Sequence, residues 1–223
     1  MPIERKKSIR EQVYEYLKEE IVSGKIKEES RIVEEEYALK LNVSRTPLRE
    51  AIRMLELEGL IEGREKGGVV VPKTTKKDVE EVIKIRMALE AVIFEEIFEK
   101  VTEGDIKKLE KNIDKVQLII ENEKESLEVF KYFSDFNKTL YNIADLPRVV
   151  NLINNLNLYL KKFRKISIEN SNRRLSAHKD HVKMVEFIKK DRKKEIIDLN
   201  KKHLTEAKEF LIQQLEMRDK KDY

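Results

Sequence analysis

The sequence predicts a mostly α protein of two domains, in which an N-terminal winged helix-turn-helix with a two-stranded wing precedes an all-α helical bundle. Residues 38–53 have the pattern of a helix, a sharp turn and a second helix, and a glycine-bearing segment follows at 62–72. Beyond Pro72 no alternation typical of strands occurs, and Gly104 is the last glycine of the chain. These observations place the domain boundary near residue 73, with a winged helix over 1–73 and a helical domain over 78–223.

The first predicted helix lies between Ser8 and Gly24. Ser8 and Glu11 have the spacing of a capping box, and Gly24 is a natural stop. Between them an apolar stripe recurs at helical spacing, formed by Val13, Tyr14, Leu17 and Ile21.

The sharp turn before the second helix of the pattern has suitable residues. Ala38 is small, as a close helix crossing requires, and Asn42 tolerates the left-handed conformation of the turn. Ser44 or Thr46 can cap the next helix, and Pro47 falls in its first turn, where a missing N–H is harmless.

That next helix has two distinct faces. Arg45, Arg49 and Arg53 follow one another at four-residue spacing. A separate core face is formed by Leu48, Ala51, Ile52 and Leu55. A helix with one packed face and one arginine-bearing face suits the major groove of double-stranded DNA.

The wing is predicted over residues 60–72, where Leu60 and Ile61 lead into Glu62 to Gly68 and then Val69-Val70-Val71-Pro72. This segment has the pattern of two short strands joined by a glycine-bearing turn that contains Gly67 and Gly68. Residues 1–74 contain 15 Lys and Arg and 15 Asp and Glu, so a DNA-binding face must be a local basic stripe. Its candidate members are Lys6, Lys7, Arg10, Arg45, Arg49, Arg64, Lys66 and Lys73. The alternative is a solvated helix face whose arginines pair with Glu50 and Glu56.

The 223 residues contain no cysteine, no apolar run long enough to span a bilayer and no signal-peptide pattern. We therefore expect a cytoplasmic protein without membrane contact. After Pro72 the sequence predicts six helices, near 78–102, 105–122, 125–144, 147–168, 171–190 and 193–218.

Polar residues interrupt the apolar stripes of several of these helices. They are Arg86 and Glu90, which are four residues apart, then Asn137, His181 and His203. His181 and His203 each lie eleven residues from residue 192, in the turn expected between two antiparallel helices. The two imidazoles should therefore face each other, with His178 one turn from His181, as half of a metal site or as hydrogen-bonded core residues.

The N-terminal third resembles the GntR family of bacterial transcription regulators. The resemblance rests on Val-Ser-Arg-Thr-Pro-Leu-Arg-Glu-Ala at 43–51, Leu-Glu-Leu-Glu-Gly-Leu at 55–60 and the wing glycines. It implies that Arg45, Thr46, Arg49 and Gly67 or Gly68 approach DNA and that Ser44 contacts phosphate. Some relatives carry a further DNA-contacting arginine where this chain has Glu34-Glu35-Glu36.

The remainder resembles the FCD subgroup, whose helical domain binds a small carboxylate effector, commonly through a divalent metal. Arg86, Glu90, His181 and His203 match its pattern, but Phe133 and Asn137 stand where an aspartate and a histidine are expected. The resemblance thus implies an effector pocket of Arg86, Glu90, Asn137, His181 and His203. A zinc, nickel or manganese ion at His181 and His203 is one version of that pocket, and a metal-free pocket is the other.

The sequence therefore predicts a transcription regulator that binds a palindromic operator as a homodimer and responds to a small organic acid. One alternative is a constitutive DNA-binding regulator whose helical domain only dimerises. An enzyme is not expected, because Glu90 is the only carboxylate on the apolar stripes and Arg86 would keep it ionised.

Overall fold

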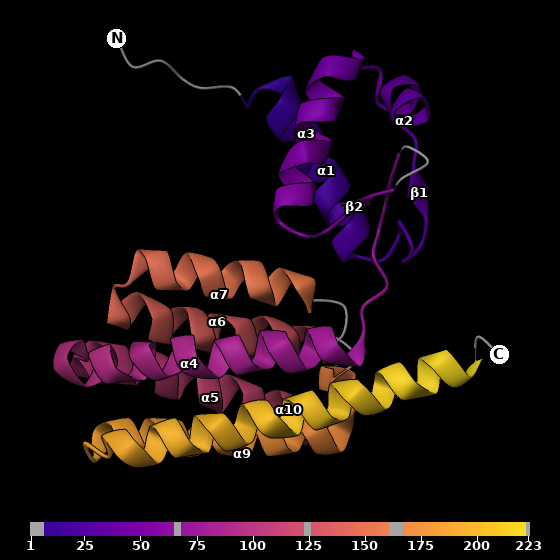
Figure 1. The fold of residues 1–223 in the computed structure, drawn as a ribbon. Coiled ribbons are helices and arrows are strands. Elements are labelled where there is room, and N and C mark those ends of the chain that lie inside the picture. The colour runs from indigo at the N-terminus through magenta and orange to yellow at the C-terminus, as the bar shows by residue number, and fades with distance from the viewer. Residues whose placement is uncertain (1–6, 65–67, 123–125, 161–166, 222–223) are drawn as a thin grey trace, which may run out of the picture. The chain divides into compact units, whose positions relative to one another are not determined.

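The computed structural model describes residues 7–64, 68–122, 126–160 and 167–221. They form two compact units, residues 1–74 and 75–223 (Figure 1). The first unit contains helices α1 (Ile9–Val22), α2 (Glu34–Leu41) and α3 (Arg45–Leu57), and strands β1 (Arg31–Ile32), β2 (Glu62–Gly63) and β3 (Val69–Val70). This is the predicted winged helix-turn-helix.

The local signals of the first unit act as expected except at the start of α3, where the N-cap residue Ser44 makes no capping hydrogen bond with a described residue. The Ser8 and Glu11 side chains complete a capping box at the start of α1. Asn42 adopts φ 51° and ψ 49° between α2 and α3, which is the left-handed conformation that the sharp turn requires. The buried face of α3 consists of Leu48, Ala51, Ile52 and Leu55.

The wing has one strand more than the sequence predicts. β3 pairs antiparallel with β2, as expected, and also with β1, so that the order is β1-β3-β2. Arg31 and Glu62 flank Val70 on either side. A strand of two residues is too short to show an alternation of apolar and polar residues. The sequence therefore does not reveal β1 or its pairing with β3.

The second unit contains α4 (Lys76–Lys100), α5 (Glu103–Glu121), α6 (Ser126–Ala144), α7 (Pro147–Tyr159), α9 (Ser171–Lys189) and α10 (Lys193–Lys221). Helix α4 packs against α6, α7 and α10, while α5 packs against α6 and α9 (Figure 1). No helix within the described residues is long and apolar enough to cross a membrane.

The ends of these helices agree with the predicted ranges to within three residues except in α7, which ends at Tyr159 and not at residue 168. No glycine or proline marks that end, and residues 161–166 lie outside the described part. Asp145 and Asp191 take the left-handed conformation between α6 and α7 and between α9 and α10. The core is centred on Phe136, Ile93 and Ile97, all nearly inaccessible to solvent.

Candidate DNA face and effector pocket

The residues expected to contact DNA lie together at the start of α3. Ser44, Arg45, Thr46 and Arg49 are all exposed there, while Leu48 between them is buried. Ser44 stands at the N-cap, but its hydroxyl makes no capping hydrogen bond in the described part of the chain. The Ser44 hydroxyl therefore does not bond to the backbone of α3.

The two recognition arginines pair with the first turn of α2. Arg45 Nη2 lies 2.6 Å from Glu35 Oε1, and Arg49 contacts Glu34 with Nε at 3.2 Å and Nη2 at 2.9 Å, both to Oε2. The hydrogen bond from Arg49 lowers the pKa of the Glu34 carboxyl. The expected alternative partners, Glu50 and Glu56, are not those that Arg45 and Arg49 use.

The wing turn needs glycine at residue 68. Gly68 has φ +82°, and a Cβ there would lie 2.8 Å from Nε of Arg31. Its carbonyl accepts a hydrogen bond from the backbone N–H of Arg64, which closes the turn between β2 and β3. Gly67 lies outside the described residues.

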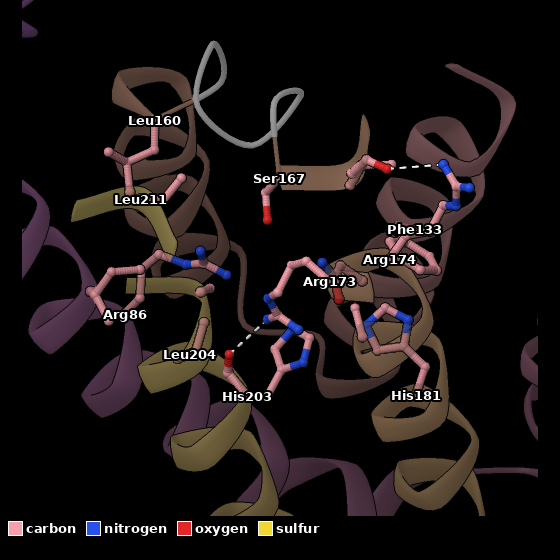
Figure 2. A pocket seen from close by; sticks show the side chains of 15 residues that line it. Arg86, Phe133, Leu160, Ser167, Arg173, Arg174, His181, His203, Leu204 and Leu211 are labelled. Carbon is pink, nitrogen blue, oxygen red and sulfur yellow. Dashed lines mark hydrogen bonds between the residues drawn. The ribbon is translucent and has the colours of Figure 1, made fainter. Parts of the chain in front are cut away.

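A cavity of about 70 Å³ lies inside the helical unit (Figure 2). Four of the five residues expected around an effector line it, namely Arg86, Asn137, His181 and His203. Apolar side chains complete much of the wall, among them Ile83, Phe133, Leu160, Leu204 and Leu211. The apolar stripes thus bring residues of α4, α6, α9 and α10 to one hollow.

Glu90 lies beside this cavity without lining it. Its Oε1 accepts hydrogen bonds from Arg86 Nη2 at 2.7 Å and from the Tyr141 hydroxyl at 3.1 Å, and its Oε2 accepts one from Asn200 Nδ2 at 3.1 Å. Burial would raise the pKa of Glu90, but the charge of Arg86 and these hydrogen bonds keep it below its usual value. Glu90 is therefore an ionised anchor that orients Arg86.

Arg173 is a cavity residue that the sequence analysis missed. Its side chain is 9 % exposed, and its Nη2 donates to the backbone carbonyl of His203 at 3.0 Å. Nε and Nη1 are buried without a hydrogen-bond partner among the described residues, and Glu206 Oε2 is 3.7 Å from Nη1. Burial lowers the pKa of Arg173. A signal existed, because Arg173 lies eight residues before His181 on the same stripe of α9.

The two expected histidines meet across the α9–α10 hairpin, with ring centroids 5.4 Å apart. His181 stacks on Phe136 at 4.3 Å and meets the edge of Phe133 at 4.7 Å. His203 Nδ1 lies 3.0 Å from Asp180 Oδ2. His178 does not join them, because its Nε2 pairs with Gln117 Oε1 on α5 at 2.8 Å.

These residues do not fit a metal ion. No group of three His, Asp or Glu side chains that could hold a metal occurs within the ranges that the structure describes. Phe133 packs against His181 where the FCD pattern would supply a carboxylate. Two imidazoles alone leave a tetrahedral site half filled.

Comparisons with known proteins agree with both units. A model of bacterial regulatory proteins of the gntR family matches residues 9–71, and a model of the FCD domain matches residues 81–206. The chain is 30 % identical to the HTH-type transcriptional regulator YdhC of Bacillus subtilis, over 82 % of this chain and 81 % of that protein. It is also 30 % identical to the HTH-type transcriptional repressor RspR of Escherichia coli, over 72 % and 70 %.

The fold also matches a solved structure, E. coli McbR/YncC, with a TM-score of 0.74 at 21 % identity, covering 94 % of this chain and all of that one. Together with the match to the FCD model over more than half of the chain, this accounts for both units. The chain is a bacterial transcription regulator and belongs to the GntR family, with an FCD domain as its second unit.

Proposed function

We propose that this regulator binds an inverted-repeat operator as a homodimer and that a short-chain carboxylate in the cavity of the helical unit changes its affinity for DNA. The DNA would be read by Arg45, Thr46 and Arg49 of α3, since an exposed arginine fork matches the O6 and N7 of guanine. As a protein that binds bacterial DNA, it would act in the cytoplasm.

The observation that carries the effector proposal is the buried guanidinium of Arg173. Arg173 lines the cavity, and its Nε and Nη1 are buried without hydrogen-bond partners in the described chain, with Glu206 Oε2 at 3.7 Å from Nη1, although a buried cation normally has several hydrogen bonds. A carboxylate in the cavity would be an anionic partner for this guanidinium. Arg86 and Arg174 line the same cavity, so three arginines contribute to its wall, while Glu90, Asp180 and Glu206 carry negative charge around it.

The size of the cavity narrows the class of ligand. Its volume of about 70 Å³ is roughly half that of an engineered 150 Å³ cavity that binds benzene. The apolar wall of Leu160, Leu204 and Leu211 suits a short alkyl chain. Acetate, propionate and pyruvate are therefore the first probes, and we infer that they bind without a metal.

A thermal-shift titration tests the proposal. A probe at a hundred times its dissociation constant should stabilise the protein by about 2.7 kcal/mol and raise its melting temperature. The Arg173→Met variant should lose that rise, because it lacks the guanidinium that would hold the carboxylate. Arg148→Met, an exposed arginine of α7 outside the cavity, should respond like the original chain.

DNA binding measured with and without the same probes separates a sensor from a constitutive regulator. A sensor requires that the probe change operator affinity, whereas a helical unit that only dimerises would leave affinity constant. An equal rise in melting temperature for Arg173→Met and the original chain would refute the assigned pocket. We also infer that the chain is not an enzyme, since three donors hold Glu90 as an ionised acceptor.

A further inference from the structure

A basic side chain that the candidate DNA-binding stripe does not include lies against the wing turn. Arg31, on β1, is exposed and pairs in register with Val70 of β3. Gly68 lies two residues before Val70, at the turn itself. Arg31 Nη2 and Cζ are 3.2 Å and 3.4 Å from the position that a Cβ of Gly68 would occupy. The guanidinium of Arg31 thus extends from β1 along β3 to the wing turn.

Glycine at residue 68 leaves room for this guanidinium. A Cβ at Gly68 would come within 2.8 Å of Arg31 Nε, so any other residue would displace the arginine. Gly68 is itself exposed, which places the guanidinium at the surface of the turn. A guanidinium remains charged at every physiological pH. The wing turn therefore carries a permanent positive charge that the sequence of the turn does not reveal.

The segment that carries Arg31 also leads to the recognition helix. β1 ends at Ile32 and α2 begins at Glu34, with one residue between them (Figure 1). Glu34 Oε2 accepts the hydrogen bonds of Arg49, at the start of α3. Three residues of extended chain span at most about 10 Å, so the backbone of Arg31 lies close to the residue that contacts Arg49. Arg31 is thus near both parts of the winged helix that are expected to meet DNA.

We propose that Arg31 is a further DNA-binding residue and that it contacts a backbone phosphate beside the wing. The proposal rests on the reading of DNA by Arg45 and Arg49 proposed above, and it extends that face from α3 to β1. Half or more of the hydrogen bonds between proteins and DNA go to phosphate and sugar, and the planar fork of arginine matches two phosphate oxygens. Such a contact positions the protein on the duplex and carries no sequence information.

Salt-dependent binding of the full-length Arg31→Met variant tests this assignment. Methionine keeps an unbranched apolar stem beside the buried Val70 but has no charge, so a residue that only covers Val70 could be replaced without loss. Loss of one phosphate contact should make the slope of log K against log salt shallower by about 0.9 for each bound chain, which is about eightfold weaker binding at 0.1 M salt. The loss should be equal on a random-sequence duplex and on an operator obtained by binding-site selection. Arg31→Lys should restore most of the slope.

Lys27→Met is the matched control. Lys27 is exposed and precedes β1, at the end of the strand opposite to the wing turn, where its neighbour Glu28 accepts a hydrogen bond from Thr74 Oγ1 at 3.0 Å. Its slope should equal that of the original chain. An unchanged slope for Arg31→Met, an equal loss for Lys27→Met, a loss confined to the operator, or no recovery with Arg31→Lys overturns the phosphate contact.

Arg49→Met separates this proposal from the reading of DNA by α3. Lost operator preference in Arg49→Met, together with an unchanged slope in Arg31→Met, supports α3 and overturns the role of Arg31 alone. Retained operator preference in Arg49→Met refutes the reading by α3, and a shallower slope in Arg31→Met on the random-sequence duplex then still supports the phosphate contact.

Discussion

Two buried arginines of the helical unit, Arg86 and Arg173, differ in the partners that compensate their charge. Arg86 donates hydrogen bonds to Glu90, which also accepts hydrogen bonds from Tyr141 and Asn200. Arg173 has a single hydrogen bond in the described structure, to the carbonyl of His203, and a longer ion pair in which Glu206 Oε2 is 3.7 Å from Nη1. Burying a cation costs several kcal/mol unless partners compensate, so Arg86 is a structural ion pair and Arg173 is the residue that gains most from an anionic ligand.

The sequence predicted some of these residue positions and missed others for a geometric reason. His181 and His203 could be paired from the sequence, because equal distances from a helical turn bring residues of antiparallel helices together. His178 could not, because three residues along a helix rotate a side chain by about 60°, enough to direct it to α5 and Gln117. Arg173 was overlooked because an arginine on a stripe is usually exposed.

The environment of His178 predicts a dependence of stability on pH. Burial lowers the pKa of its imidazole, so the folded protein takes up this proton only below the pH at which the unfolded chain does, about 6.5. As the pH falls through that value, protonation therefore favours the unfolded state. His178→Gln should lose less free energy of unfolding than the original chain between pH 7.5 and 5.5, by no more than about 1.4 kcal/mol per pH unit.

Urea unfolding at the two pH values measures this difference. Gln retains a group that can pair with Gln117, so the comparison isolates the titration from the loss of a contact. Lys179→Gln serves as a control, because Lys179 is an exposed neighbour of His178 on α9. Identical pH dependence in His178→Gln and the original chain would show that His178 is protonated equally in both states.

At the scale of elements, the sequence predicted helices well and their partners less well. Capping boxes at Ser8, Thr75 and Thr102 begin α1, α4 and α5, and such signals are local. The end of α7 and the strand β1 carry no local signal, since α7 stops without glycine or proline and β1 has only two residues. What determines them is packing between segments distant in the sequence.

The pairing of α2 with α3 has a consequence for DNA binding. Glu34 accepts hydrogen bonds from Nε and Nη2 of Arg49, two donors that a guanine could use, and Glu35 accepts one from Nη2 of Arg45. These pairs are exposed and so contribute about 0–1 kcal/mol each, small enough for an operator to displace. The carboxylates should therefore suppress weak, non-specific contacts of the arginines with phosphate while permitting specific ones.

We predict that Glu34→Gln and Glu35→Gln each increase affinity for random-sequence DNA. Each freed arginine that reaches a phosphate should steepen the slope of log K against log salt by about 0.9. Glu36→Gln removes the same charge from the same turn of α2, from an exposed residue with no ion pair in the described chain, and should leave the slope unchanged. Fluorescence anisotropy across a salt series decides the matter, and equal slopes for all three variants would rule out this role for the ion pairs.

At the scale of the whole molecule, the need for two copies follows from how few bases one α3 can contact. Its exposed start offers three candidate side chains to base edges, Arg45, Thr46 and Arg49, which is too few for an operator to stand out among genomic sites. Two copies related by a two-fold axis double the contact and require a palindrome. We propose that the helical unit joins the two copies.

The last prediction follows from that symmetry. An operator obtained by binding-site selection should be an inverted repeat that binds two chains per duplex in sedimentation experiments, and an isolated half-site should bind at least a hundredfold more weakly. The two half-sites must be presented on one face of the duplex, about 10–10.5 base pairs or a multiple apart. Inserting five base pairs between them should therefore abolish tight binding by turning one half-site to the opposite face, whereas inserting ten should restore part of it. A complex of one chain per duplex, with equal affinity for the half-site and the full site, would show that a single winged helix suffices.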